Sequence, residues 1–144
     1  MTREVTTPEL EPGTFLITSG MDDRARASCK ALPRADGNAH PIFAFIAALG
    51  GMGTSIAALC ELCGSSIEAG PVLASTRIRW LAPMTVDSEY GVEARIVDTV
   101  AKQSRRFGKA IHARIRFTVL HGETECAEVD IHMILPERES DDER

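Results

Sequence analysis

The sequence has few aromatic side chains and no excess of positive charge. Phe, Trp and Tyr make up 5% of the 144 residues, and the formal net charge is -5 at pH 7. Proteins that bind single-stranded nucleic acid combine a positively charged groove with aromatic rings on which the bases stack. The composition argues against such a surface, so we expect no nucleic-acid partner.

Long uninterrupted apolar runs are also missing. The most apolar stretch, Pro41 to Leu62, is broken by glycines, by hydroxyl side chains and by Glu61. It is therefore expected to form a buried helix and not a membrane span. The first residues, Met1 to Glu11, are polar and lack the apolar core of a signal peptide. We expect no membrane association and a cytoplasmic location.

The four cysteines do not suggest a disulfide framework or a metal site. A chain of 144 residues can bury a full core without such cross-links. Cys60 and Cys63 have the spacing of a redox pair or of half a zinc site, but no second pair lies near them. They fall at the C-terminal end of the expected helix, where the helix dipole does not favour a thiolate. We expect them to pack in the core.

The first half of the chain is predicted to contain a strand and two helices. A short strand at Thr14 to Ser19 leads into a helix at about Asp22 to Leu32. After the turn residues 33–39, Pro41 suits the first turn of a long helix that ends near Gly64. Because this helix is apolar nearly all round, other structure must cover it on most sides.

Everything after Gly70 is predicted to be β structure. Apolar residues alternate along four segments, which are Val72 to Leu81, Glu89 to Val100, Phe107 to Val119 and Ala127 to Leu135. A long central helix wrapped by a curved antiparallel sheet is an α+β arrangement, the hotdog fold. We assign residues 1–136 to a single hotdog domain and residues 137–144 to a charged, disordered tail.

One segment in the middle of the chain is similar to a known family. Arg79-Trp80-Leu81-Ala82-Pro83-Met84, with the following strand Tyr90 to Val97, resembles the arginine-tryptophan-leucine-x-proline strand pair of MaoC-like enoyl-CoA hydratases and dehydratases. Supporting motifs are Gly13-Thr14-Phe15, Asp22-Asp23, Ser104, Gly108 and His121-Gly122-Glu123. The resemblance covers most of residues 10–135 and implies a hotdog domain that binds an acyl thioester. It is partial at Val86-Asp87-Ser88, where the family carries glycine-aspartate.

The resemblance also locates a candidate active site. Catalytic family members have an aspartate, then x-asparagine-proline-x-histidine, an overhanging segment, and a second histidine that opens the central helix. Here Asp36-Gly37-Asn38-Ala39-His40-Pro41 leads directly into the helix, so the overhang is missing. In one alignment Asp36 and His40 are a compressed catalytic pair. In the other, Ala39-His40-Pro41 is the helix opening, and the chain resembles the non-catalytic subunits of heterodimeric dehydratases. Both alignments stay open.

Hydration of a 2-enoyl thioester needs a base, a proton donor and a hydrogen-bond donor for the thioester oxygen. Asp36 and His40 can share the first two tasks. Pro41 has no N–H, so the donor for the thioester oxygen is expected from Ala39, from Ile42 or from a partner chain, and Asn38 is a further expected substrate contact. None of these steps requires a metal or an organic cofactor, and we expect neither. Structural alternatives are a loop turn for Asp36 and a helix cap for His40.

A basic cluster is a further candidate for substrate binding. Arg105, Arg106 and Lys109 lie close together in the sequence and suit the phosphates of coenzyme A. The alternative is a solvated hairpin tip.

Three function hypotheses follow. The leading one is an (R)-type enoyl-CoA hydratase or 3-hydroxyacyl dehydratase, and the second is a non-catalytic subunit of such an enzyme. The third, an acyl-CoA thioesterase, generally has a carboxylate on the central helix, where only Glu61 is acidic and lies far from His40. In each case the ligand is an acyl-CoA or an acyl-carrier thioester. An uncovered edge strand predicts at least a dimer. The dimer is a homodimer or, as the compressed Asp36 to Pro41 loop with its missing overhang suggests, a heterodimer with a second MaoC-like chain.

Overall fold

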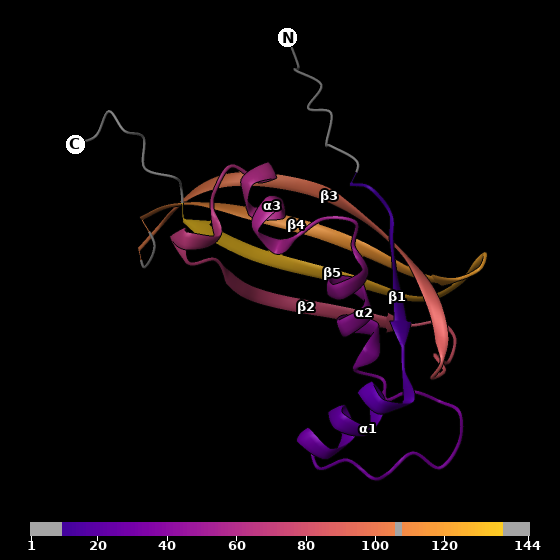
Figure 1. Cartoon of the computed structure of the whole chain (residues 1–144). Helices are drawn as coiled ribbons and strands as arrows, with labels where there is room; N and C mark the ends of the chain where they lie inside the picture. The colour runs from indigo at the N-terminus through magenta and orange to yellow at the C-terminus, as the bar shows by residue number, and fades with distance from the viewer. Residues whose placement is uncertain (1–9, 106–107, 137–144) are drawn as a thin grey trace.

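The computed structural model of the chain describes residues 10–105 and 108–136 (Figure 1). The tail predicted at 137–144 therefore lies outside the described residues. The elements in order are β1 (Gly13–Ile17), α1 (Ser19–Ser28), α2 (Phe43–Gly51), α3 (Ile56–Leu62), the 3-10 turn η1 (Ile67–Ala69), β2 (Val72–Trp80), β3 (Ser88–Ser104), β4 (Gly108–His121) and β5 (Thr124–Pro136).

The strands form one antiparallel sheet in the order β1-β3-β4-β5-β2. Hairpins join β3 to β4 and β4 to β5, while β1 and β2 form the two edges. The sheet curves around α2 and α3 (Figure 1), as expected for a hotdog fold. The four predicted C-terminal strands are confirmed, because alternating apolar side chains allow one face of each strand to be buried.

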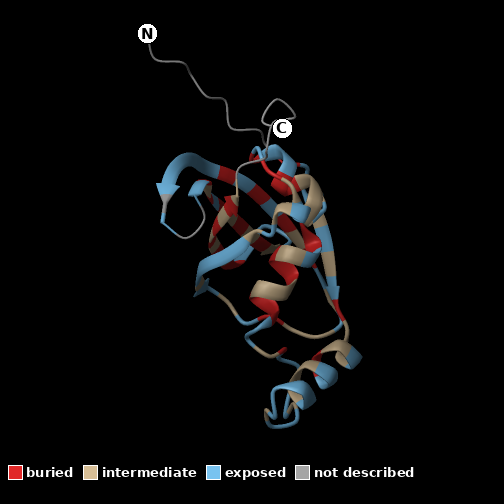
Figure 2. Ribbon diagram, turned by 90° about the vertical axis from the view of Figure 1, so that its left-hand side faces the viewer, coloured by how far each residue is buried: buried red, intermediate tan, exposed pale blue. Residues whose placement is uncertain are grey.

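The core lies between the concave face of the sheet and the central helices. Buried residues alternate with mostly half-buried ones along β4 and β5 (Figure 2). Phe117 and Val129 of the sheet and Phe43, Ala47 and Leu59 of the helices are at most 2% exposed. Small side chains on α2 let the sheet approach this helix closely, as the sequence predicted.

The central helix is not continuous, which corrects the prediction of one helix from Pro41 to Gly64. It is divided into α2 and α3, whose axes differ by 70°. The break occurs at residues 52–55, where the Ser55 side chain accepts a hydrogen bond from the Ala58 N–H and starts a new helix. Among the described residues, no single helix is long and apolar enough to cross a membrane, and only this bent pair reaches the required length together.

Close backbone packing explains where the helix breaks. The Gly53 N–H donates a hydrogen bond to the Glu11 carbonyl oxygen at 3.1 Å, so the segment before β1 crosses the end of α2. A Cβ atom on Gly13 would overlap the Gly51 carbonyl oxygen, and one on Gly51 would lie 2.6 Å from Val92 Cγ2. Only glycine leaves room for this crossing.

The other helix boundaries also differ from the prediction. Helix α1 begins at Ser19, three residues earlier than expected, because the Thr18 hydroxyl accepts a hydrogen bond from the Met21 N–H. It ends at Ser28, and Lys30 then adopts a positive φ of 57°. The loop between α1 and α2 is therefore longer than the sequence suggested.

The tight crossing gives a stability prediction. Gly13→Ala should lower the free energy of unfolding by about 1–3 kcal/mol, the usual effect of overpacking, because the new Cβ meets backbone that cannot rotate away. Gly37→Ala is the control, since nothing lies within 4 Å of its Cβ position. Urea denaturation of both variants measures the difference. Equal stability of the two variants would contradict the packing argument.

Candidate functional site

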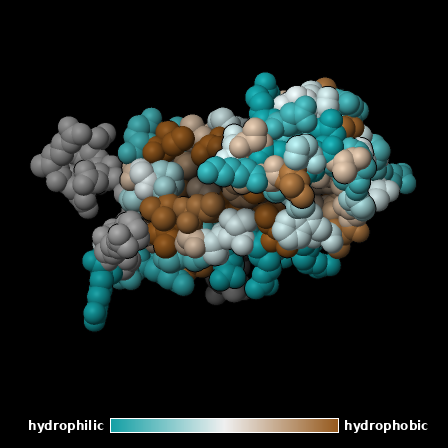
Figure 3. Space-filling view, turned by 90° about the horizontal axis from the view of Figure 1, so that it is seen from below, coloured by the Kyte–Doolittle hydropathy of each residue, from teal (hydrophilic) through white to brown (hydrophobic). Residues whose placement is uncertain are grey.

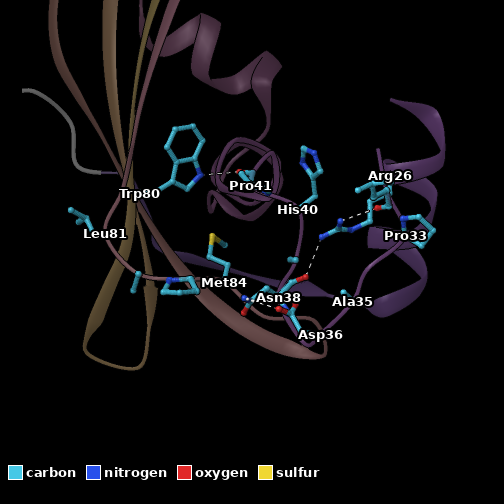
Figure 4. A pocket seen from close by; sticks show the side chains of 14 residues that line it. Arg26, Pro33, Ala35, Asp36, Asn38, His40, Pro41, Trp80, Leu81 and Met84 are labelled. Atoms are coloured by element: carbon cyan, nitrogen blue, oxygen red, sulfur yellow. Dashed lines mark hydrogen bonds between the residues drawn. The ribbon is translucent and has the colours of Figure 1, made fainter. Parts of the chain in front are cut away.

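A hollow of about 910 Å³ lies between the loop that precedes α2 and the segment that follows β2 (Figure 4). Its size falls within the range of small-molecule sites in proteins. Most of the lining side chains are apolar, and apolar surface is also exposed on the side of the molecule seen in Figure 3. The lining residues are Arg26, Leu32, Pro33, Ala35, Asp36, Asn38, Ala39, His40, Pro41, Trp80, Leu81, Ala82, Pro83 and Met84.

The hollow brings together the two segments that the sequence singled out. Asp36, Asn38, Ala39 and His40 form one wall, and the segment Trp80 to Met84 forms the other. These segments are about 40 residues apart in the chain. The sequence identified each of them separately, but only the tertiary structure makes them neighbours.

Hydrogen bonds hold the two walls in a fixed relation. The Trp80 indole N–H donates to the Pro41 carbonyl oxygen at 3.0 Å, and the Ala39 N–H donates to the Met84 carbonyl oxygen at 2.8 Å. The Val86 N–H donates to the Gly37 carbonyl oxygen at 2.9 Å. The loop from Gly37 to Pro41 is therefore fastened along its length to the segment after β2.

Asp36 lies exposed at the margin of the hollow and forms a local turn. Its Oδ1 atom accepts a hydrogen bond from the backbone N–H of Asn38 at 2.8 Å, and its Oδ2 atom accepts one from the side-chain Nδ2 of Asn38 at 3.4 Å. This is the structural alternative considered for Asp36. The imidazole of His40 points away from the Asp36 carboxylate (Figure 4). The two residues share the hollow but do not form a pair.

His40 forms a hydrogen-bonded turn just before the central helix, whose N-cap residue is Ile42. The His40 Nδ1 atom accepts a hydrogen bond from the Ile42 N–H at 3.0 Å, so in the neutral ring Nε2 carries the proton. The backbone N–H of His40 donates to Asp22 Oδ1 at 2.6 Å. Ile42 is 38% exposed but does not line the hollow. The helix-cap alternative therefore placed the cap two residues too early, although the His40 ring does accept the last N–H before α2.

The backbone N–H groups at the helix start are already hydrogen-bonded within the chain. Those of Asn38, Ala39, His40 and Ile42 have the partners given above, and the Phe43 N–H donates to the His40 carbonyl oxygen. Pro41 has no N–H. None of the donors expected for a thioester oxygen in this loop is left unpaired.

A buried carboxylate that the sequence reasoning did not assign to the site organises this loop. Asp22 is fully buried, and its Oδ2 atom accepts hydrogen bonds from Arg26 Nε at 2.8 Å and Arg34 Nη1 at 3.0 Å. Arg26 also donates to the carbonyl oxygens of Leu32 and Asn38. The spacing of Asp22 and Arg26, one helical turn apart, was the only signal for this network in the sequence.

Hydrogen bonding decides the protonation of Asp22. Burial alone would raise the pKa of this carboxyl, but hydrogen bonds from the His40 N–H, Arg26 and Arg34 outweigh burial and lower the pKa below its ordinary value. Asp22 is therefore ionised at neutral pH and holds α1, the 34–40 loop and the start of α2 together.

The basic cluster at the β3–β4 hairpin is far from the hollow. Lys109 pairs with Gln103 at one end of β4, whereas Val119 pairs with Ala127, which in turn pairs with Trp80. Ten residues separate Lys109 from Val119, which is about 33 Å along a strand. Arg105 lies beside this hairpin, and Arg106 lies outside the described residues.

The cysteines of the central helices are buried, as expected. Burial raises the pKa of the Cys60 thiol and, as the main cause, raises that of Cys63 to about 11. Both thiols are therefore protonated at neutral pH, which does not suit redox or metal chemistry. In the described part of the chain, no group of three or more His, Cys, Asp or Glu side chains is arranged to hold a metal ion.

No protein-family model and no curated protein sequence matches this chain. Its fold is similar to a chain of the ChsH1-ChsH2 complex from Mycobacterium tuberculosis, with 13% identity, a TM-score of 0.68 and 91% and 86% of the two chains covered. It is also similar to a chain of the HadBC (3R-hydroxyacyl-ACP dehydratase) complex from the same organism, with 12% identity, a TM-score of 0.61 and 93% and 99% covered.

A MaoC-like dehydratase from Rhodospirillum rubrum shares the fold at 13% identity and a TM-score of 0.54, with 93% and 94% covered. So does a Bartonella henselae protein described as "Probable Thioesterase", at 13% identity and a TM-score of 0.56, with 88% of each chain covered. At these identities the likeness concerns the fold. The chain has the hotdog fold of MaoC-like dehydratases, as the sequence resemblance predicted.

The Asp22 network gives a second prediction. Asp22→Asn should lower the free energy of unfolding at pH 7 by about 2–4 kcal/mol, because two arginines lose a buried anionic partner. A carboxyl with a lowered pKa stabilises the fold above its ordinary pKa, and this contribution is lost as the pH falls below about 4. The difference between wild type and variant should therefore shrink below that pH.

Urea denaturation at pH 7 and at pH 3 measures both effects. Asp23→Asn is the matched control, since the Asp23 side chain is 64% exposed and its ion pair with Arg34 is worth little. Equal effects of the two substitutions at pH 7 would rule out the role assigned to Asp22.

Proposed function

We propose that this chain is an acyl-thioester-binding subunit of a hotdog (R)-type enoyl-CoA hydratase or 3-hydroxyacyl dehydratase. In this proposal the chain forms a wall of the acyl site, and a second MaoC-like hotdog chain supplies the acid and the base. The observation that carries the proposal is an apolar hollow bounded by a loop in which every backbone N–H from Asn38 to Phe43 is already hydrogen-bonded.

The lining of the hollow supports an acyl ligand. Trp80, Leu81 and Met84 on one wall and Leu32 and Pro33 on the other offer apolar contact without fixed charge. Such a surface favours the hydrocarbon part of a ligand, because its burial removes apolar area from water. The HadBC dehydratase, which shares the fold and is described as acting on a hydroxyacyl-ACP, supports a thioester head group. In this proposal the carrier is either coenzyme A or an acyl carrier protein.

The hydrogen bonds already formed by the loop support a non-catalytic role. Addition of water to a 2-enoyl thioester places negative charge on the thioester oxygen, and donors aimed at that oxygen make a large contribution to the rate. In this chain the Ala39 and Ile42 N–H groups donate to Met84 and to His40. Freeing either donor would break a contact that holds the loop.

The exposed edge of the sheet supports a partner. Strand β2 pairs only with β5 among the described strands, and the hollow's second wall begins at Trp80, the last residue of β2. A hotdog chain that pairs along this edge lies beside the hollow and can extend it. The ChsH1-ChsH2 and HadBC structures are complexes, which is consistent with such an arrangement.

A second candidate is catalysis by Asp36 and His40 of this chain. It is favoured by one observation, which is that both side chains line the same hollow. The His40 Nε2–H of the neutral ring can donate a hydrogen bond to the substrate, while Asp36 is exposed and can accept a proton from an attacking water. This candidate requires the thioester oxygen to find a donor on another chain.

The thioesterase hypothesis has no comparable support from the site. Glu61, the acidic residue of the central helices, is exposed on α3 and does not line the hollow. The proposed hydration uses proton transfer and dipoles alone, so we propose that it needs neither a metal nor an organic cofactor. A cytoplasmic location also remains part of this proposal.

Enzyme assays separate the two candidates. The isolated chain is expected to hydrate a short 2-enoyl-CoA no faster than buffer, as followed by loss of the enoyl absorbance. If Asp36 and His40 are catalytic instead, the wild type will turn over, and Asp36→Asn and His40→Ala will each reduce the rate by roughly 10²–10⁴-fold. Circular dichroism of both variants checks that lost activity does not reflect unfolding.

Binding is tested separately from catalysis with a saturated acyl-CoA, which cannot be hydrated. Trp80→Ala should weaken the binding of octanoyl-CoA by about tenfold, because it removes a large apolar contact from the wall. Val100→Ala, an apolar truncation at an exposed position that does not line the hollow, should leave the affinity unchanged. Isothermal titration calorimetry measures both. Unaltered affinity in Trp80→Ala would argue against acyl binding in this hollow.

A further inference from the structure

The free edge of the sheet carries an unbalanced charge. Strand β2 has the sequence Val-Leu-Ala-Ser-Thr-Arg-Ile-Arg-Trp, which includes two arginines and no acidic residue. Arg77 and Arg79 pair with Asp130 and Glu128 of β5 and lie on the outer, convex face of the sheet, while Trp80 contacts the helix side. One face of this edge is therefore cationic and the other is apolar.

The acidic neighbours on β5 are already shared with another arginine. Asp130 accepts two hydrogen bonds from Arg116 of β4, at 2.7 and 3.3 Å. Glu128 lies 3.7 Å from Arg116 and 4.0 Å from Arg79. Because Arg116 takes most of this negative charge, the acidic groups of β5 neutralise the edge arginines only in part.

A second hollow, on the convex face, is lined by further arginine side chains. It has a volume of about 440 Å³ and extends from the β2 edge to β4, with Arg77, Arg114 and Arg116 in its lining. Asp130 is the acidic residue that lines it. An acidic side chain that arrives from beyond the β2 edge would meet Arg77 first and would have Arg114 and Arg116 behind it.

Pairing of β2 with the same strand of a second copy brings arginines together in every register whose two-fold axis lies between Thr76 and Arg79. In an antiparallel pair, directly opposite residues lie on the same face of the sheet. A two-fold axis at Ile78 places Arg77 opposite Arg79 of the second copy, twice. An axis at Arg77 or at Arg79 places that arginine opposite itself, and an axis at Thr76 places the two Arg77 side chains on a diagonal.

We propose that the partner at this edge is a different hotdog chain whose edge strand presents Asp or Glu on its convex face, opposite Arg77 and Arg79. Its concave face is apolar and continues the surface around Trp80. Like charges directly opposite destabilise a strand pair, whereas opposite charges stabilise it. This inference names the partner of the site proposed above, and it rests on pairing along β2 but not on the chemistry of the hollow.

A charge-swap experiment tests it with the full-length chain. The double variant Arg77→Glu, Arg79→Glu carries the acidic edge that the partner should have. Sedimentation velocity at micromolar concentration compares three samples, which are wild type alone, the variant alone and an equimolar mixture. The mixture should form a 1:1 dimer with an affinity at least about fivefold higher than that of either protein alone. The preference should fall as salt is raised.

The control reverses the same number of charges away from the edge. Arg24→Glu, Lys102→Glu changes one residue of α1 and one of β3, both exposed. Its mixture with wild type should show no gain over wild type alone. The proposal is overturned if wild type alone dimerises as tightly as the charge-swap mixture, if the mixture does not associate, or if the control mixture gains equally. Because no turnover is measured, these results are independent of the enzyme assays.

Discussion

The site depends on one buried charge. The carboxylate of Asp22 has no access to water, so it is stable as an anion only while Arg26, Arg34 and the His40 N–H surround it. These donors come from α1, from the loop and from the start of the central helix. The carboxylate therefore sets where the loop runs, and the loop in turn forms one wall of the hollow (Figure 4).

The same loop is held from the opposite side by the segment that follows β2. Its backbone N–H groups and carbonyl oxygens form hydrogen bonds with this segment: the loop donates to Met84 and accepts from Trp80 and Val86. A loop whose backbone donors are all engaged within the chain suits a wall of the hollow better than a charge-stabilising site. In the proposed function the rest of the site comes from another chain, which pairs along the cationic β2 edge beside this wall.

Much of this architecture follows from local patterns. Alternating apolar residues along β4 and β5 specify which side chains face the core, because side chains alternate between the faces of a strand. Pro41 predicted a helix start two residues before the observed one at Phe43, since a proline at the first turn loses no hydrogen bond. The Arg79 to Met84 motif predicted the hotdog fold, and both walls of the hollow were identified as separate segments.

The tertiary structure decided the rest, because the deciding contacts join residues that are distant in sequence. The central helix breaks where Gly53 meets Glu11, a crossing of two backbones that no helical periodicity encodes. Asp22 lies 18 residues from His40, whose N–H it accepts. The Ala39 N–H is not free for a ligand because it donates to the Met84 carbonyl oxygen, 45 residues away. Hydrogen-bond partners so far apart in sequence are set by the packing of the whole sheet and not by the local sequence.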